Sequence, residues 1–189
     1  MPAPARADRL LAAGIVRFDL DGERSRVLIH ATSSVHPIET AAPITGWLDV
    51  SLVEDGSVDL TAPVAARVQV PLQGLRSGNP LIDREADRRL DTRRHPTVSG
   101  ELRSLEPGPA GGWRGRGDLT LHGITAPIEG TLRVDRRDDE LGLTGSTTLL
   151  VTDFDVQPPS LLLVKVHPTV RVDLDAVARL APGPRDGGT

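Results

Sequence analysis

The stretch that decides the fold is Gly115–Gly130, GRGDLTLHGITAPIEG. Leu119 and Leu121 stand two residues apart with polar residues around them, and the apolar alternation resumes at Ile128. A period of two is typical of a strand with one apolar face and one polar face. The residues from His122 to Pro127 include Gly123 and Pro127, which are typical of a turn. The stretch therefore predicts a β-hairpin with one dry face and one wet face.

The same alternation extends from this hairpin in both directions. Further strands are predicted to begin near Ile15, Arg26, Ile44, Val58, Val98, Leu141 and Val170. We interpret 58–71 as one strand with Pro63 at a bulge or an edge, and 37–43 as irregular, because an interior strand does not accept its prolines. Eight or nine antiparallel strands predict an all-β fold, an antiparallel up-and-down extended β-barrel that closes its own edges.

One segment, 78–94, has helical spacing instead. Asn79 suits the cap and Pro80 the first helical position. Ile82, Ala86 and Leu90 then recur on one face. We expect a short solvated helix that lies over an open part of the barrel, either as a fixed cover or as a moving lid.

Length and charge bound the class of protein. A chain of 189 residues favours one domain, which we place at 14–177, with flexible termini at 1–13 and 178–189. A net charge of -4 without a segregated basic face argues against nucleic acid. The apolar run at 10–16 is too short for a secretory signal or a membrane span, so we expect a cytoplasmic protein without stable membrane insertion.

Chemistry-bearing motifs are scarce. The chain has no cysteine, and its five histidines lack the spacing of a metal site. No nucleophile elbow, phosphate loop or dinucleotide fingerprint occurs. We therefore expect that the protein is not an enzyme and that it binds neither a metal ion nor a cofactor. An enzyme would need polar groups converging inside the barrel, such as Asp118, Thr120 or His122 if the strand register were inverted.

Small residues recur in the predicted inward rows, among them Gly46, Gly100, Gly115, Gly117, Gly130 and Gly145. Glycine inside a strand marks either close approach by another group or tight coiling of the barrel. An eight-stranded barrel is either filled by its side chains or holds a small ligand. Glycine counts alone leave both readings open.

The ordered motifs resemble the YceI-like family, the polyisoprenoid-binding proteins with a lipocalin-like extended barrel. The resemblance covers about residues 14–175 and rests on the opening stretch together with five landmarks: D-x-x-x-S-R-V at 21–27, I-T-G-W-L at 44–48, Asp83-Arg84 in the helix, H-P-T-V at 95–98 and T-D-F-D-V at 152–156. The scarcity of aromatic residues and the lack of a signal peptide resemble a cytoplasmic branch. The resemblance implies an isoprenoid quinone or a long-chain isoprenoid as ligand.

We therefore expect an elongated apolar lipid, such as a polyisoprenoid or an isoprenoid quinone, to bind inside the barrel without turnover. The predicted ligand-binding residues are the inward-facing Val27, Ile29, Leu48, Val68, Val70, Leu119, Leu121, Ile128 and Leu132. The expected partner is this lipid-like small molecule, and a homodimer is left open. The alternative is a filled, ligand-free barrel that serves as a stress-related or protein-interaction module.

Overall fold

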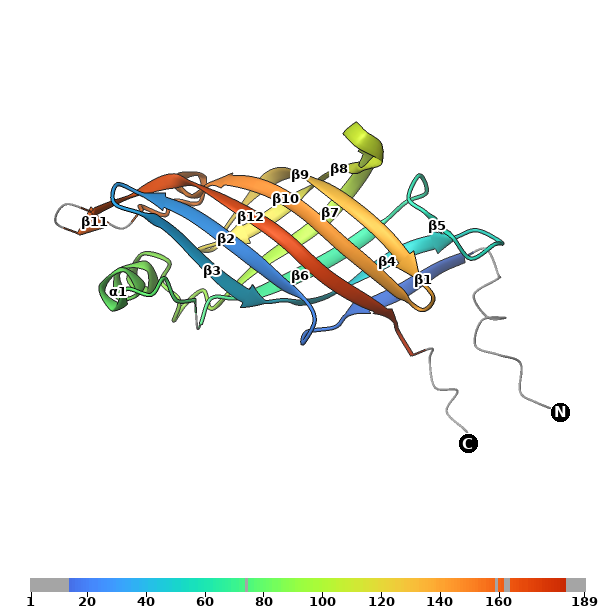
Figure 1. The fold of residues 1–189 in the computed structure, drawn as a ribbon, viewed down its shortest axis with the longest axis horizontal. Helices are drawn as coiled ribbons and strands as arrows, with labels where there is room; N and C mark the ends of the chain where they lie inside the picture. The colour runs from blue at the N-terminus through green and yellow to red at the C-terminus, as the bar shows by residue number, and fades with distance from the viewer. Residues whose placement is uncertain (1–13, 74, 159, 162–163, 183–189) are drawn as a thin grey trace.

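The computed structural model describes residues 14–182 except 74, 159 and 162–163 (Figure 1). The predicted flexible segment 1–13 and the last residues from 183 lie outside the described part. The strands in chain order are β1 Gly14–Leu20, β2 Arg26–Ser33, β3 Pro37–Pro43, β4 Thr45–Leu52, β5 Val58–Asp59, β6 Ala65–Pro71, β7 Thr97–Pro107, β8 Trp113–Leu121, β9 Ile124–Arg137, β10 Glu140–Leu150, β11 Ser160–Leu161 and β12 Val164–Leu180. The described helical segments are α1 Pro80–Arg89 and two short 3-10 turns, Pro109–Gly111 and Val151–Phe154.

The strands close into an antiparallel barrel. The sheet runs β1-β4-β6-β7-β8-β9-β10-β12, and β12 also pairs with β1, which closes a ring of eight strands over the described residues. Every strand pair within it is antiparallel. The predicted fold class is confirmed.

The last strand, β12, spans the length of the barrel (Figure 1). Near its C-terminal end it pairs with β1 through Ala178 and Leu180, and nearer its start with β2 from Val166 to Asp175. The predicted domain boundary at 177 falls short of this strand, because residues 178–180 complete the ladder to β1.

Two predictions about proline segments are wrong. The segment expected to be irregular is β3, and it pairs only with β2 at the end of the strand order. An edge strand tolerates Pro37 and Pro43, since their missing amides face no neighbour. The predicted strand 58–71 is instead two strands, β5 and β6, with Pro63 in the turn between them.

The opening hairpin is tighter than predicted. Its turn is only His122-Gly123, both with positive φ (54° and 77°), as two-residue hairpin turns prefer. Pro127 lies inside β9, opposite Asp118 of β8. The β9–β10 ladder begins only at Gly130, so Pro127 occupies an edge-like part of β9 where no amide is needed.

Four of the inward glycines lie where neighbouring strands of the barrel come very close together. A Cβ at Gly46 would lie 2.0 Å from the carbonyl oxygen of Arg67, and one at Gly117 would lie 2.2 Å from that of Glu101. Gly130 and Gly145 approach the neighbouring backbone similarly, at 2.8 and 2.7 Å. These four glycines are required because adjacent strands nearly touch, and tight coiling accounts for them.

The buried core has two parts. One cluster surrounds Phe18, Ile44 and Leu141 near the end of the barrel that carries β1. The other surrounds Phe154, with Leu72, Leu121 and Val156, near α1. Between the two parts the barrel interior is not filled. No described helix is long and apolar enough to cross a membrane.

Candidate functional site

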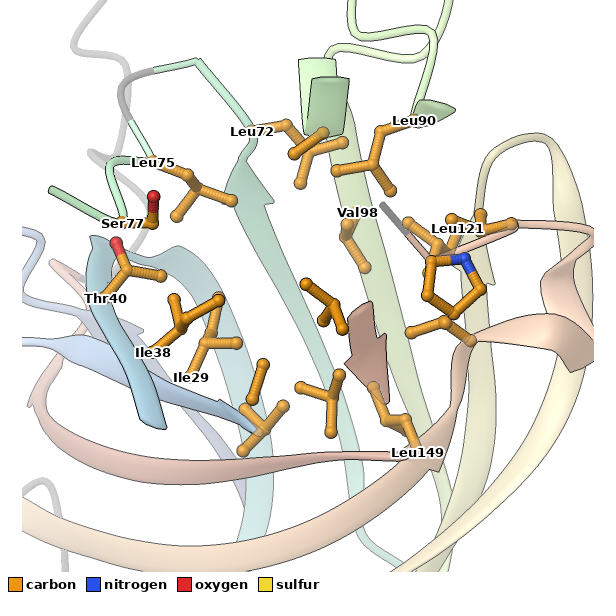
Figure 2. Close-up of a pocket in the computed structure, with 18 of the residues that line it drawn as sticks. Ile29, Ile38, Thr40, Leu72, Leu75, Ser77, Leu90, Val98, Leu121 and Leu149 are labelled. Carbon is orange, nitrogen blue, oxygen red and sulfur yellow. The ribbon is translucent and has the colours of Figure 1, made fainter. Parts of the chain in front are cut away.

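The barrel holds two apolar cavities along its axis. The inner cavity, of about 270 Å³, lies among residues of β4, β6, β7, β8, β9 and β10, including Leu48, Val68 and Leu132. The outer cavity, of about 280 Å³, lies beside α1 and includes Ile29, Ile38 and Leu121 (Figure 2). Each approaches the lower end of the range of about 300–1,000 Å³ that small-molecule sites occupy.

A ring of residues that we call the waist borders both cavities. It takes one side chain from each of β2, β6, β8, β9, β10 and β12: Val27, Val70, Leu119, Ile128, Thr147 and Val172. Its one hydroxyl, on Thr147, donates a 2.6 Å hydrogen bond to the carbonyl oxygen of Glu129 and so needs no partner from the cavity. The two cavities meet at this ring, and we call the two together the channel.

The structure places every predicted ligand-binding residue on the wall of this channel. Leu48, Val68 and Leu132 line the inner cavity, and Ile29 and Leu121 line the outer one. The remaining predicted residues belong to the waist: Val27, Val70, Leu119 and Ile128. Their shared orientation follows from the period of two along each strand. Binding of a ligand by these residues stays a prediction.

The predicted inward register of the hairpin agrees with the outer-face contacts. Asp118 pairs with Arg103, and Thr120 shares a 2.8 Å hydrogen bond with Thr125, both on the solvent side. Arg116 bridges Glu129 and Glu106 at 2.7 and 3.1 Å. The polar residues that an inverted register would bring inside are thus held outside.

Helix α1 and the segment before it cover one side of the outer cavity. Asn79 caps the helix by accepting the amide of Leu81 at 3.0 Å, and the predicted face of Ile82, Ala86 and Leu90 lines the cavity. In Figure 2, Leu72, Leu75 and Leu90 lie on this side, facing Ile29 and Ile38 across the space.

This cover fills a gap in the sheet. β3 ends the strand order, so β6 takes no ladder from it, and in the described residues the two sides are joined through the Thr40 hydroxyl. The amide of Arg76 donates to Thr40 Oγ1 at 3.2 Å. Ser77 lies beside this junction, where its amide and hydroxyl both donate to Asp83 Oδ1 at 2.7 Å (Figure 2).

The polar side chains of the channel gather at this end. Arg76, Ser77, Asp83, Arg89 and His167 line the outer cavity. Since Arg76 and His167 are exposed, the cavity reaches solvent here, and we call this rim the mouth. Within the helix, Arg89 forms an ion pair with Glu85 at 2.7 Å. Hydrogen bonds lower the pKa of the Glu85 carboxyl, and the one from Arg88 has a larger effect than the one from Arg89.

Two residues of the family motifs, Ser25 and Trp47, have structural contacts. The Ser25 hydroxyl, in a residue 3 % exposed, donates to the Val177 carbonyl at 3.1 Å and accepts its amide at 3.0 Å, which ties the β1–β2 corner to β12. Trp47 lies under the Arg17 guanidinium, 4.1 Å from the ring centroid.

The histidines also have structural surroundings. His122, in the hairpin turn, lies edge-on to the ring of His95 with centroids 5.3 Å apart, and its Nδ1 lies 3.3 Å from the carbonyl oxygen of Phe154. Over the described residues, no group of three or more His, Cys, Asp or Glu is arranged to hold a metal ion.

Sequence reasoning missed several wall residues of the outer cavity. Ile38 and Thr40 were overlooked because 37–43 was read as irregular, although Ile38, Thr40 and Ala42 alternate as a strand would. Leu72 and Leu75 follow the end of β6 in a segment without periodicity. Of these residues, only Ile38 and Thr40 could have been found from the sequence, through the alternation of their strand.

A small closed antiparallel barrel with two apolar cavities inside it is the class of protein that this geometry defines. The model of the YceI-like domain matches residues 18–178, and the chain belongs to this family. The expected resemblance is thus confirmed.

Solved structures share the fold at low sequence identity. Burkholderia cenocepacia BcnA is 14 % identical, with a TM-score of 0.68 over 84 % of this chain and 99 % of that one. A polyisoprenoid binding domain from Saccharophagus degradans is 16 % identical, with a TM-score of 0.64 over 88 % and 99 %. The Campylobacter jejuni YceI protein is 12 % identical, with a TM-score of 0.51 over 67 % and 75 %. No curated protein matches the chain.

Proposed function

We propose that this protein binds one elongated apolar lipid, of the polyisoprenoid or isoprenoid-quinone class, inside the barrel and does not transform it. The observation that carries the proposal is the pair of mainly apolar cavities inside the barrel, which share the six residues of the waist. Burial of apolar ligand surface there contributes about 25 cal/mol per Å². The description of the Saccharophagus degradans neighbour as a polyisoprenoid binding domain supports the same ligand class.

The shape of the site favours a single chain with a small polar end. The waist is aliphatic except for Thr147, and the outer cavity carries the charged side chains of Arg76, Asp83 and Arg89 at the mouth. A ligand would lie with its chain through the waist and its polar group near Ser77 and Arg76. The channel also weighs against the filled, ligand-free barrel, since that alternative needs large side chains across the waist.

Titration of delipidated protein with a long-chain isoprenoid quinone tests the proposal. We expect a saturable rise in Tm and a one-to-one complex in native mass spectrometry. The variant Leu119→Trp places a large ring in the waist and is expected to abolish both signals. Thr120→Trp puts the same ring one residue away on the outer face.

The two variants separate the channel from a general effect on the barrel. Equal ligand binding by Leu119→Trp, Thr120→Trp and the unchanged protein would place the ligand elsewhere. If the unchanged protein takes up no quinone and releases no apolar lipid on extraction after purification, the proposed function is wrong.

A further inference from the structure

Two inward glycines, Gly100 on β7 and Gly115 on β8, are not required by close strand contact. A Cβ at Gly100 would meet no backbone atom within 4 Å beyond its chain neighbours. One at Gly115 would lie 4.0 Å from the carbonyl oxygen of Gly130, whereas at Gly117 a backbone oxygen would be only 2.2 Å away. The packing of the strands therefore leaves room for a side chain at Gly100 and at Gly115.

The backbone conformation does not require these two glycines either. Neither has a φ in the positive range that favours glycine. Each continues a regular strand ladder, in which Gly100 pairs with Leu119 and Gly115 pairs with Gly130. Glycine inside a strand is less stable than alanine, because it loses more backbone entropy on folding. Two glycines that the fold does not need therefore indicate another role, and close approach by a ligand is one that glycine in a strand serves.

Both glycines lie on the wall of the inner cavity. Gly100 lies beside the waist, since it is paired with Leu119, a waist residue. Gly115 stands four residues before Leu119 on the same face of β8, which is ~13 Å along the strand at about 3.3 Å per residue. One glycine is therefore at the waist, and the other is deeper in the inner cavity.

The atoms nearest to the missing Cβ groups are the methyl ends of aliphatic side chains. They belong to Val68 and Leu119 beside Gly100, at 3.1 and 3.8 Å, and to Leu102 and Leu105 beside Gly115, at 3.3 and 3.5 Å. All four side chains line the inner cavity. Because the glycines project no side chain, these methyl groups can lie close over the backbone, which leaves the cavity wider.

Alanine at either position would push these methyl groups toward the cavity. A distance of 3.1 Å to Val68, or of 3.3 Å to Leu102, is shorter than the separation of about 3.5–4.0 Å at which carbon atoms attract best. Since the ladders on both sides hold β6 and β7 in place, the side chains have to move into the open space, which is the cavity. The two glycines thus set the width of the inner cavity.

We propose that Gly100 and Gly115 are specificity-determining residues, which keep the inner cavity wide enough for a methyl-branched hydrocarbon chain. A straight chain is thinner and would leave voids beside the two glycines, and the groups around a void lose dispersion contacts. The aliphatic neighbours of both glycines offer no hydrogen bond, so the ligand groups that fill this width have to be apolar. The inference rests on the proposed function and names the type of chain that the same channel selects.

Phytanol and hexadecanol test the proposal, because they share their backbone length and hydroxyl group and differ in the methyl branches of phytanol. Displacement of a bound fluorescent polyene measures both affinities. We expect Gly100→Ala and Gly115→Ala each to weaken phytanol binding roughly tenfold, as one methyl group does in an apolar pocket, and to change hexadecanol binding little. The diagnostic quantity is the ratio of the two affinities, since phytanol is the more apolar alcohol and binds more tightly on that ground alone.

A matched control and a compensating variant separate cavity width from a general effect on the barrel. Gly142→Ala adds the same methyl group at a strand glycine that lines neither cavity, and it is expected to leave the ratio unchanged. Gly100→Ala combined with Val68→Ala removes the methyl groups that the new Cβ would displace, and it is expected to regain phytanol binding. A Tm close to that of the parent shows that each variant is folded.

The inference and the proposed function fail separately. An unchanged ratio in both glycine variants overturns the inference, while uptake of isoprenoid quinone by the parent would still support the proposed function. Failure of the double variant to regain phytanol binding also overturns the inference, because crowding by Val68 would then not be the cause. If the parent and the variants bind phytanol as expected but the parent takes up no isoprenoid quinone, the proposed ligand class is wrong and the inference stands. A parent that binds neither alcohol overturns the inference.

Discussion

The backbone amide of Arg76 donates to the hydroxyl of Thr40 at 3.2 Å, across the gap between β3 and β6, two strands that do not pair. This contact joins the segment before α1 to the edge strand of the sheet. Leu75 packs beside it on both core clusters. Among the described residues, the gap is therefore closed by side chains and by this hydrogen bond to the sheet edge instead of by a strand ladder.

Replacing Thr40 by valine is expected to speed exchange of the ligand. The variant keeps the shape of the side chain and removes the acceptor, at a cost of about 1 kcal/mol or less because the Arg76 amide can turn to water. Transfer of a fluorescent polyene between protein and vesicles, followed by stopped flow, measures the rate. Thr32→Val, at an exposed position of β2, is the control. Unchanged transfer in Thr40→Val would show that the ligand takes another route.

The waist predicts selectivity for chain length. Val172→Trp narrows the passage between the cavities, so the outer cavity remains open while the inner one is cut off. We expect the variant to bind short-chain isoprenoid quinones nearly as well as the parent and long-chain ones at least tenfold more weakly, about 1.4 kcal/mol. Titration with a series of chain lengths measures this. Arg133→Trp, outside the barrel on β9, is expected to leave the series unchanged.

Strand contact at Gly117 predicts a loss of stability. In Gly117→Ala the new methyl group would lie 2.2 Å from the Glu101 carbonyl oxygen, so the β7–β8 backbones must separate. We expect a cost of about 1–3 kcal/mol, as for other overpacked sites. Gly142→Ala is the matched control, because its nearest non-local atom would be 3.7 Å away. Equal urea midpoints for the two variants would contradict this account of the glycines.

Acid stability depends in part on Glu140. Hydrogen bonds from Arg24, and then from Arg179, lower the pKa of this carboxyl below its ordinary 4.5. A lowered folded-state pKa means that the stabilisation is present above pH 4.5 and is lost as the pH falls through the folded-state value.

Glu140→Gln is therefore expected to destabilise the protein at neutral pH and to match the parent in acid. Urea unfolding at about pH 7 and about pH 3 measures the difference. Glu23→Gln is the control, because it changes a carboxyl of the neighbouring β1–β2 turn that forms no ion pair among the described residues. A constant difference between Glu140→Gln and the parent at both pH values would rule out the charge as its cause.

Alternation predicted most of the barrel because each strand buries one face. The interval from Leu102 to Leu105, three residues instead of two, even matches the register shift between Leu102 and Ser104 in β7. The helix was predictable because Asn79-Pro80 and the Ile82 face agree on its start and orientation. The pairing of strands that are not joined by a hairpin could not be predicted, because a period of two does not indicate which strand is the neighbour in the sheet.

The prolines led to wrong strand predictions, because the local sequence of an edge strand does not differ from that of an interior strand. Pro37, Pro43 and Pro127 all lie in strands, and each occupies a position whose amide faces no neighbouring strand. Whether a position is an edge depends on the closed topology, which local sequence does not contain. The channel also depends on the closed topology of the barrel. Strand contact explains Gly46, Gly117, Gly130 and Gly145, and the cavities arise from how the strands are arranged around them.

The dependence of both barrel ends on β12 has a consequence for how the chain folds. This strand is the last to be synthesised, and it pairs with β10 on one side and with β1 and β2 on the other. Until it arrives, the apolar inner faces of β2 and β10 have no shared neighbour. The barrel therefore closes only after β12 has left the ribosome, and until then the apolar inner faces that β12 covers stay open to solvent.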